Sequence, residues 1–285
     1  MLSTLQENRI TLERAINELR MVDDSDYWET DDELSCDFAI IPEIVAGAVG
    51  YALSDLRRVG LHLMIDIGAS TVDMCSFILH QADGGDRYSL LVTDVKLLGT
   101  IRLHHERIAS IQHYHERRSQ DLRDSHDPLM PITDDIEPYI LRREEMINEI
   151  RAAEDELKAE CMKMMKLIIR DAKQRDPNSS VWRTGRLPIL LIGGGSQLPF
   201  FSSTVEKLDG WLREFDINEG TILMQVTVPE SLLSQTDDYY RLVVAWGLSH
   251  REFDIGEVTP ASRIMAVEQP PHQDWEERYI GPEQI

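Results

Sequence analysis

Two carboxylates, Asp66 and Asp73, enclose a short segment that could bind a phosphate. The segment consists of four small residues: Gly68, Ala69, Ser70 and Thr71. Small side chains allow successive backbone N–H groups to point at one anion, and the two hydroxyls add donors. The carboxylates suit Mg²⁺ held through water, or the orientation of a water that attacks a terminal phosphate. The pattern therefore predicts a phosphate-binding loop, although an ordinary hairpin turn could have the same residues.

A second glycine-rich segment follows a buried-strand pattern at residues 187–192 and precedes a helix that starts near Leu198. It consists of Gly193, Gly194, Gly195, Ser196 and Gln197. The segment lacks the lysine of a P-loop and the spacing of G-x-G-x-x-G, so neither of those phosphate motifs applies. A strand, a glycine loop and a helix in succession indicate either a ligand site or a tight turn without a ligand.

Glu43 is the third candidate, because it opens a helical segment rich in alanine and glycine. A glutamate in this position either faces a ligand or interacts with the helix dipole in the first turn.

The elements around these residues predict an α/β fold with a mixed sheet. Apolar runs at 61–67, 72–79 and 88–98 predict an antiparallel meander, and a further strand is expected at 222–228. Helical periodicity covers 3–20, 101–124, 139–174 and 237–250, and the region from residue 257 is expected to be irregular. The apolar stripe of 139–174 favours packing on the body of the protein over a coiled coil. The expected divisions are 1–36, 37–134, 135–180, 181–252 and 253–285.

Four segments in order resemble the second half of the nucleotide-binding domain of the DnaK-type heat shock protein 70 family. They are 41–51, 65–73, 191–199 and 244–248, and they correspond to the first connecting helix, second phosphate loop, adenosine loop and second connecting helix of that family. The resemblance covers about residues 36–250. It implies the second lobe of an actin-like ATPase, which has a ribonuclease H-like fold, with 135–175 as an inserted helical subdomain.

The resemblance also implies roles for the candidate residues. Asp66 and Asp73 would lie at the Mg²⁺ and attacking-water end, with Asp66 as the metal-side carboxylate, and Glu43 would position water. Residues 68–71 would hold the β and γ phosphates of ATP or ADP. Residues 193–196 would lie under the ribose and α phosphate, with Gln197 near the adenine.

Three departures from the family restrict the expected activity. Ala69 and Ser70 replace glycines of the family loop, and Gln197 stands where the family has an arginine that stacks on adenine. Nothing before Asp37 resembles the first phosphate hairpin or the lysine-bearing strand, so the first lobe is absent. We therefore expect poor hydrolysis of ATP by this chain alone. The first lobe could be a separate polypeptide that acts as a partner, or it could be missing because the chain is a truncated gene product. A non-catalytic interaction module and an actin-like filament subunit are the alternatives.

Composition excludes some partners. The formal charge of −22 in 285 residues disfavours nucleic acid and anionic membranes, which are polyanions. No apolar run is long enough to span a bilayer and no signal peptide is evident, so a cytoplasmic location is expected. Three scattered cysteines predict neither a disulfide framework nor a thiolate metal site. The histidines between 104 and 126 are expected on a solvated helix face rather than in a metal or pH-sensing site.

Overall fold

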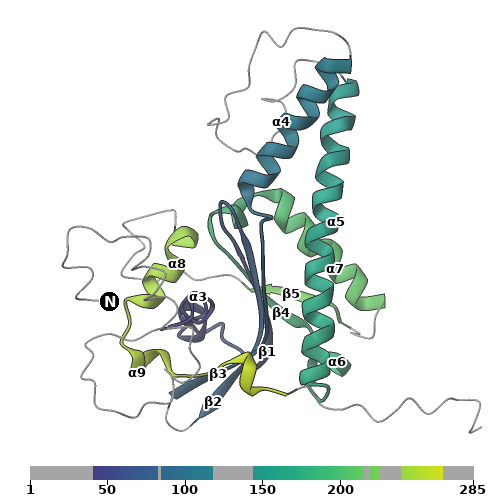
Figure 1. Cartoon of the computed structure of the whole chain (residues 1–285). Coiled ribbons are helices and arrows are strands. Elements are labelled where there is room, and N and C mark those ends of the chain that lie inside the picture. Colours follow the sequence, from purple (N-terminus) through teal and green to yellow (C-terminus); the bar gives the residue numbers. More distant parts are fainter. Residues whose placement is uncertain (1–40, 83–84, 118–143, 215–218, 225–238, 266–285) are drawn as a thin grey trace, which may run out of the picture. The chain divides into compact units, whose positions relative to one another are not determined.

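The computed structural model describes residues 41–82, 85–117, 144–214, 219–224 and 239–265 (Figure 1). The chain divides into two compact units, 1–40 and 41–285, and all the described residues belong to the second. The helix expected at 3–20 and the acidic stretch after it therefore lie outside the described residues, as does the tail from residue 266.

Six strands form one mixed sheet in the order β5-β4-β1-β2-β3-β6. Strand β2 runs antiparallel to β1 and β3, whereas β1–β4, β4–β5 and β3–β6 are parallel pairs. Their bounds are Gly60–Ile67 for β1, Val72–Ala82 for β2, Gly85–Lys96 for β3, Leu187–Ile192 for β4, Thr221–Met224 for β5 and Glu257–Thr259 for β6. The predicted α/β class with a mixed sheet is confirmed, and so is the antiparallel meander.

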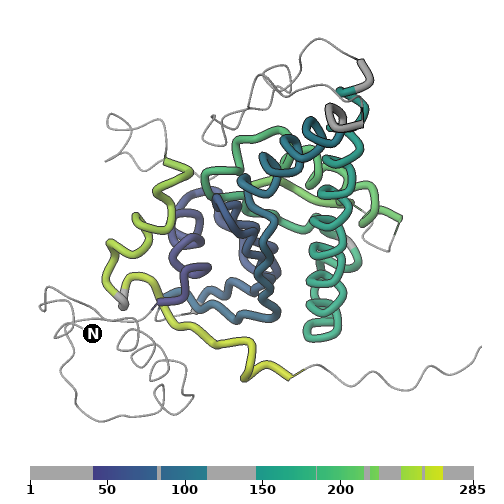
Figure 2. The backbone as a smooth tube through the Cα atoms, turned by 45° about the horizontal axis from the view of Figure 1, so that its top comes forward, coloured from purple at the N-terminus to yellow at the C-terminus, as the bar shows by residue number. Residues whose placement is uncertain are grey.

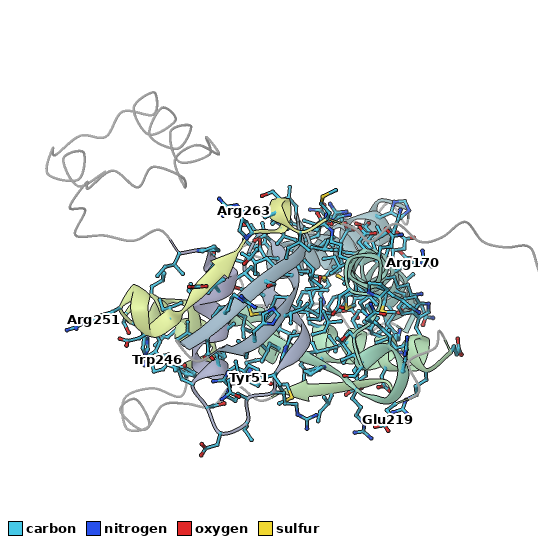
Figure 3. All side chains as sticks on the ribbon, turned by 90° about the horizontal axis from the view of Figure 1, so that it is seen from below. Tyr51, Arg170, Glu219, Trp246, Arg251 and Arg263 are labelled. Carbon is cyan, nitrogen blue, oxygen red and sulfur yellow. The ribbon has the colours of Figure 1, made fainter. Side chains whose placement is uncertain are left out.

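Helices cover both faces of this sheet (Figure 1). One face carries α3 (Glu43–Ala52), α8 (Tyr239–Leu248) and α9 (Glu252–Ile255), and the other carries α5 (Glu144–Arg175) and α7 (Pro199–Glu214). Strand β1 is buried on both sides: Leu63 and Ile65 join the core beneath α5 and α7, and Met64 joins the core beneath α3 and α8. Such two-sided burial explains the nearly continuous apolar sequence of β1. Tyr51 and Trp246 lie on one side of the sheet and Arg170 on the other (Figure 3).

Helix α5 packs directly on the sheet. Its apolar stripe, which includes Leu157, Cys161, Met164 and Ile168, belongs to the same buried core as β1. The predicted packing against the body of the protein is confirmed. The expected start of this helix, at 139–143, lies outside the described residues.

Helix α4 (Thr100–Arg117) lies alongside α5, as Figures 1 and 2 show. Arg107 is 2% exposed, and its guanidinium contacts Oε1 of Glu154 at 2.7 Å. His104 is also buried, so the expectation of a solvated face was wrong for this histidine. The reason is that α5, distant in sequence, covers one face of a helix that looks polar by itself.

Helices α3 and α8 cross at very short distance because both have small residues at the crossing. A Cβ on Gly247 would overlap the carbonyl oxygen of Ala46, and one on Gly50 would lie 2.8 Å from the hydroxyl oxygen of Tyr239. The glycines and alanines of these two segments therefore allow the two helices to approach closely.

The region after residue 257 is not irregular throughout, which corrects the sequence-based expectation. Strand β6 pairs in parallel with β3, and the short helix η5 (Ala261–Arg263) follows it. The guanidinium of Arg175, at the end of α5, donates to the carbonyl oxygens of Leu91 and Ala261. This arginine ties the segment to the edge of the sheet. A three-residue strand is too short to give a clear sequence pattern.

Candidate functional site

The two glycine-containing loops come together at one edge of the sheet. Because β1 and β4 are parallel neighbours, with Asp66 paired to Ile192, both loops leave the carboxyl ends of adjacent strands. Gly193 has φ +85°, and a Cβ there would overlap the carboxylate of Asp66 and lie 2.5 Å from the carbonyl oxygen of Ile67. Only glycine fits this position, for both reasons. The candidate residues of the two segments thus form one site.

Helix α4 holds the 68–71 loop through three backbone hydrogen bonds. The N–H groups of Gly99, Thr100 and Ile101 donate to the loop carbonyls, at 3.2 Å to Ser70, 3.1 Å to Gly68 and 2.8 Å to Ala69. The turn itself is closed by a 3.0 Å bond from the N–H of Gly68 to the carbonyl of Thr71. The first turn of α4 therefore fixes the loop conformation, a role that the sequence analysis missed.

These bonds also determine where the loop N–H groups point. In a planar trans peptide the C=O and the following N–H point in opposite directions, and the described residues contain no cis peptide bond. Since the carbonyls of residues 68–70 point at α4, the N–H groups of Ala69, Ser70 and Thr71 point away from it. Among the described residues, none accepts a hydrogen bond from these three groups. Successive free N–H groups of this kind form an anion-binding concavity.

Three carboxylates face the same region. Asp66 and Asp73 are directly opposite each other in the β1–β2 ladder. Burial is the main cause that raises the pKa of Asp66 to about 6, and the negative charges of Glu43 and Asp73 contribute to the same shift. Ionised Asp66 is thus unfavourable in this site unless a cation is near. The structure brings together all three residues proposed from the sequence.

The hydroxyl of Thr71 does not have the expected role. It donates a 2.8 Å hydrogen bond to Oδ2 of Asp73, so its proton is directed to a carboxylate rather than to a phosphate. This bond orients Asp73 instead. Ser70 is exposed at the tip of the loop. The donor role expected of its hydroxyl stays a prediction.

The donor chemistry of the site fits Mg²⁺ held mainly through water. Within the described ranges, no group of three His, Cys, Asp or Glu side chains is arranged to bind a metal directly. Mg²⁺ normally retains several waters and binds one or two carboxylates together with substrate phosphates. Asp66 and Asp73 can supply that number of ligands.

The second loop contributes further donors. The N–H of Gly193 donates to the carbonyl of Tyr240 at 3.2 Å, which fastens the loop to α8. No described residue accepts a hydrogen bond from the N–H groups of Gly194 and Gly195. Gln197 is exposed and its amide nitrogen lies 3.4 Å from Oγ of the buried Ser196. The amide of Gln197 is therefore at the surface beside the loop. Its expected position near an adenine stays a prediction.

Arg241 is a residue that sequence reasoning missed. It lies in the first turn of α8, and a Cβ on Gly194 would be 3.7 Å from its Nε. Arg241 is exposed and places a positive charge next to a loop surrounded by carboxylates. Its position, 47 residues after Gly194, carries no local signal. Only the packing of α8 against the glycine loop reveals it.

Comparison with known proteins adds no assignment: no protein-family model matches the chain, and no curated protein matches it in sequence. In the part of the chain that the structure describes, none of the helices is both long enough and apolar enough to cross a membrane.

Proposed function

We propose that this chain binds the phosphates of ATP or ADP, with Mg²⁺, between the 68–71 and 193–196 loops. In this proposal the chain is the second lobe of an actin-like ATPase of the DnaK heat-shock type. The observation that carries the proposal is the orientation of the 68–71 loop. Its carbonyls bond to α4 and three successive N–H groups point away.

The charges of the site support the same conclusion. Backbone N–H groups and Arg241 attract phosphate oxygens, while Asp66 and Asp73 favour a divalent cation. A Mg²⁺ nucleotide brings both charges at once. When bound, Mg²⁺ neutralises charge on the phosphates. The protein groups position them: residues 69–71 and 194–195 would donate to phosphate oxygens, and Glu43 would orient a water.

The arrangement of elements supports the actin-like part of the proposal. The resemblance implies a mixed sheet, and the chain has one, with β2 antiparallel to both of its neighbours in the order β5-β4-β1-β2-β3-β6. The contact of α3 with α8 through Ala46 and Gly247 is what two connecting helices that cross beneath a nucleotide site require. Both features arise from segments far apart in the sequence.

Titration calorimetry with Mg²⁺-ADP tests the proposal. Gly194→Asp adds a negative charge to the loop, and a side chain there meets only Arg241 at ordinary contact distance. We expect the affinity of this variant to fall at least about tenfold, which corresponds to about 1.4 kcal/mol. The control is Gly210→Asp, at an exposed helical glycine with open space around it. It should bind as the unchanged chain does.

Two results would refute the proposed function. One is the absence of any binding by the unchanged chain at about 1 mM nucleotide. At this concentration even a binding free energy of only about −4 kcal/mol is detectable. The other is equal binding by Gly194→Asp and Gly210→Asp, which would place the nucleotide elsewhere.

A further inference from the structure

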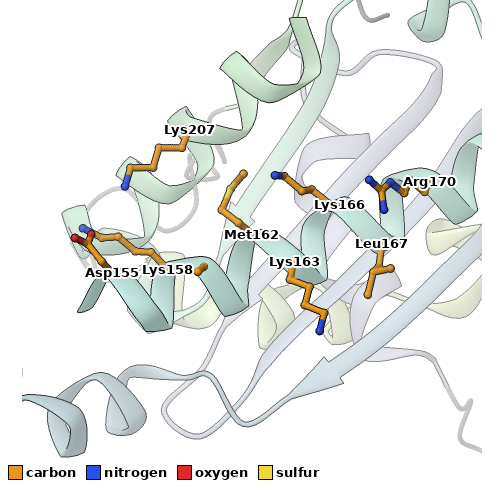
Figure 4. A pocket seen from close by; sticks show the side chains of 9 residues that line it. Asp155, Lys158, Met162, Lys163, Lys166, Leu167, Arg170 and Lys207 are labelled. Carbon is orange, nitrogen blue, oxygen red and sulfur yellow. The ribbon is translucent and has the colours of Figure 1, made fainter. Parts of the chain in front are cut away.

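A second candidate binding surface lies away from the glycine loops, in a groove between α5 and α7. The groove has a volume of about 640 Å³. Figure 4 shows the side chains that line it, with Lys207 on α7 facing the residues of α5. Five of the lining residues are cations, and only one, Asp155, is acidic; the cations are Lys158, Lys163, Lys166, Arg170 and Lys207. This groove is basic on a chain with a formal charge of −22.

Three of the five cations, Lys158, Lys166 and Arg170, lie in a row because of helix periodicity. Residues 158, 162, 166 and 170 are spaced four apart, so they lie on one face of α5. The row from Lys158 to Arg170 spans twelve residues, or about 18 Å at 1.5 Å per residue. An extended peptide advances about 3.3 Å per residue, so five or six residues match this length.

Aromatic rings of α7 hold three of these cations. The Nζ of Lys158 lies 5.1 Å from the ring centroid of Phe200, and that of Lys166 lies 5.1 Å from the ring of Trp211. The guanidinium of Arg170 lies 5.9 Å from the same ring. Cation–π contacts of this length restrict where the charged groups can move. The row of positive charge is therefore built into the packing of the two helices.

The lining is also partly apolar. Met162 lies between Lys158 and Lys166 in the row, and Leu167, 40% exposed, is a large apolar side chain at the surface of α5. Cations four residues apart repel each other on a helix surface, and this repulsion is relieved when an anionic ligand binds. A suitable ligand carries several negative charges and at least one apolar group.

We propose that this groove binds an acidic peptide segment of a partner protein in extended conformation. Carboxylates of the peptide contact the cations of α5 and Lys207, and an apolar side chain of the peptide covers Met162, which lies in the row. A peptide meets these requirements better than nucleic acid does. The net charge of −22 repels a long polyanion that extends beyond the groove, whereas a peptide of about six residues stays within the length of the row. This inference does not depend on nucleotide binding.

Fluorescence anisotropy with the full chain tests the proposal. The probe is a labelled peptide of about six residues, the length that matches the row, made of glutamates with one tryptophan and one leucine. The test variant combines Lys163→Glu with Lys207→Glu, since both residues are exposed and neither stacks on an aromatic ring in the cation–π contacts described above. The control combines Arg151→Glu with Arg186→Glu, two exposed arginines outside the groove. Both pairs change the net charge equally.

We expect the test variant to weaken peptide binding at least about tenfold, and the control to leave it within about twofold. A peptide with glutamines in place of glutamates should bind at least about tenfold more weakly than the acidic probe. If Lys163→Glu with Lys207→Glu fails to fold, the pair Lys163→Gln and Lys207→Gln replaces it, with the same order of affinities expected.

Several outcomes would overturn the proposal. They are equal loss of affinity in test and control, no binding of the probe at about 1 mM, and equal binding of the glutamine peptide. Tighter binding of single-stranded DNA or of inorganic triphosphate than of the peptide would also overturn it, because the groove would then take a different anion.

Discussion

Asp66 shows how a single residue connects stability with the proposed function. Its carboxyl is partly buried beside two other carboxylates, and its pKa is raised from 3.8 to about 6. The unfolded chain loses this proton at lower pH than the folded chain does. The free energy of unfolding therefore decreases as the pH rises from about 4 to about 6, and the decrease is complete above that. Burial and the neighbouring carboxylates both disfavour the ionised form, and a bound cation would stabilise it.

Asp66→Asn should stabilise the protein above pH 6. Removing the charge should raise the free energy of unfolding by about 1 to 3 kcal/mol at pH 8 and leave it nearly unchanged at about pH 3.5. Chemical denaturation at both pH values measures this difference. Asp155→Asn, at an exposed carboxylate, is the control and should have no effect at either pH. Added Mg²⁺ should stabilise the unchanged protein but not Asp66→Asn, and an equal effect on both would contradict the proposed metal side.

At the scale of elements, the site depends on two places where the backbones of two segments approach each other closely. The loop at 68–71 rests on the first turn of α4, where a Cβ on Gly99 would lie 2.5 Å from the carbonyl oxygen of Ala69. Helix α3, which carries Glu43, crosses α8, which carries Arg241, at Ala46 and Gly247. These approaches set the positions of the carboxylate and the cation at the site.

The α3–α8 crossing predicts opposite effects for the same substitution at two helical glycines. Gly247→Ala would force the helices apart, and we expect it to reduce the free energy of unfolding by about 1 to 3 kcal/mol, as overpacking does. Gly210→Ala is in an exposed part of α7 with open space around it and should raise the free energy of unfolding by about 0.5 to 1 kcal/mol. Urea denaturation of both variants gives the two values. Effects of the same sign would mean that the crossing is not tightly packed.

At the scale of the whole molecule, the proposed site would supply one side of a phosphate clamp. Phosphoryl transfer depends on positioning and charge stabilisation around the phosphates. The residues described here provide carboxylates, N–H groups and one arginine at the site. The resemblance would place the first phosphate hairpin and a lysine-bearing strand on a first lobe, and residues 1–36 resemble neither.

We therefore expect binding without measurable ATP turnover by this chain alone. A phosphate-release assay should show no hydrolysis above background, because in this proposal part of the charge stabilisation would come from a first lobe. Hydrolysis should appear when a polypeptide with a first lobe of the same type is added. Steady turnover by the chain alone, lost in Asp66→Ala, would contradict this prediction, since the single lobe would then be sufficient.

The sequence by itself determined the local features of the fold. Apolar runs identified β1, β2, β3 and β4 because strand burial depends on consecutive side chains. Glycines identified the two loops, since positions such as Gly193 require a conformation that other residues rarely adopt. The order of four segments suggested a family, and that resemblance suggested roles for the site residues. That assignment of function stays a prediction.

Only the tertiary structure decided which segments meet. The parallel pairing of β1 with β4 joins the loops at 68 and 193, and α4 aims the N–H groups of the first loop by binding its carbonyls. Arg241, the use of the Thr71 hydroxyl by Asp73 and the burial of His104 had no sequence signal. Each of these three features depends on a contact with a neighbour whose position is fixed by packing. A periodic pattern within one segment carries no information about that neighbour.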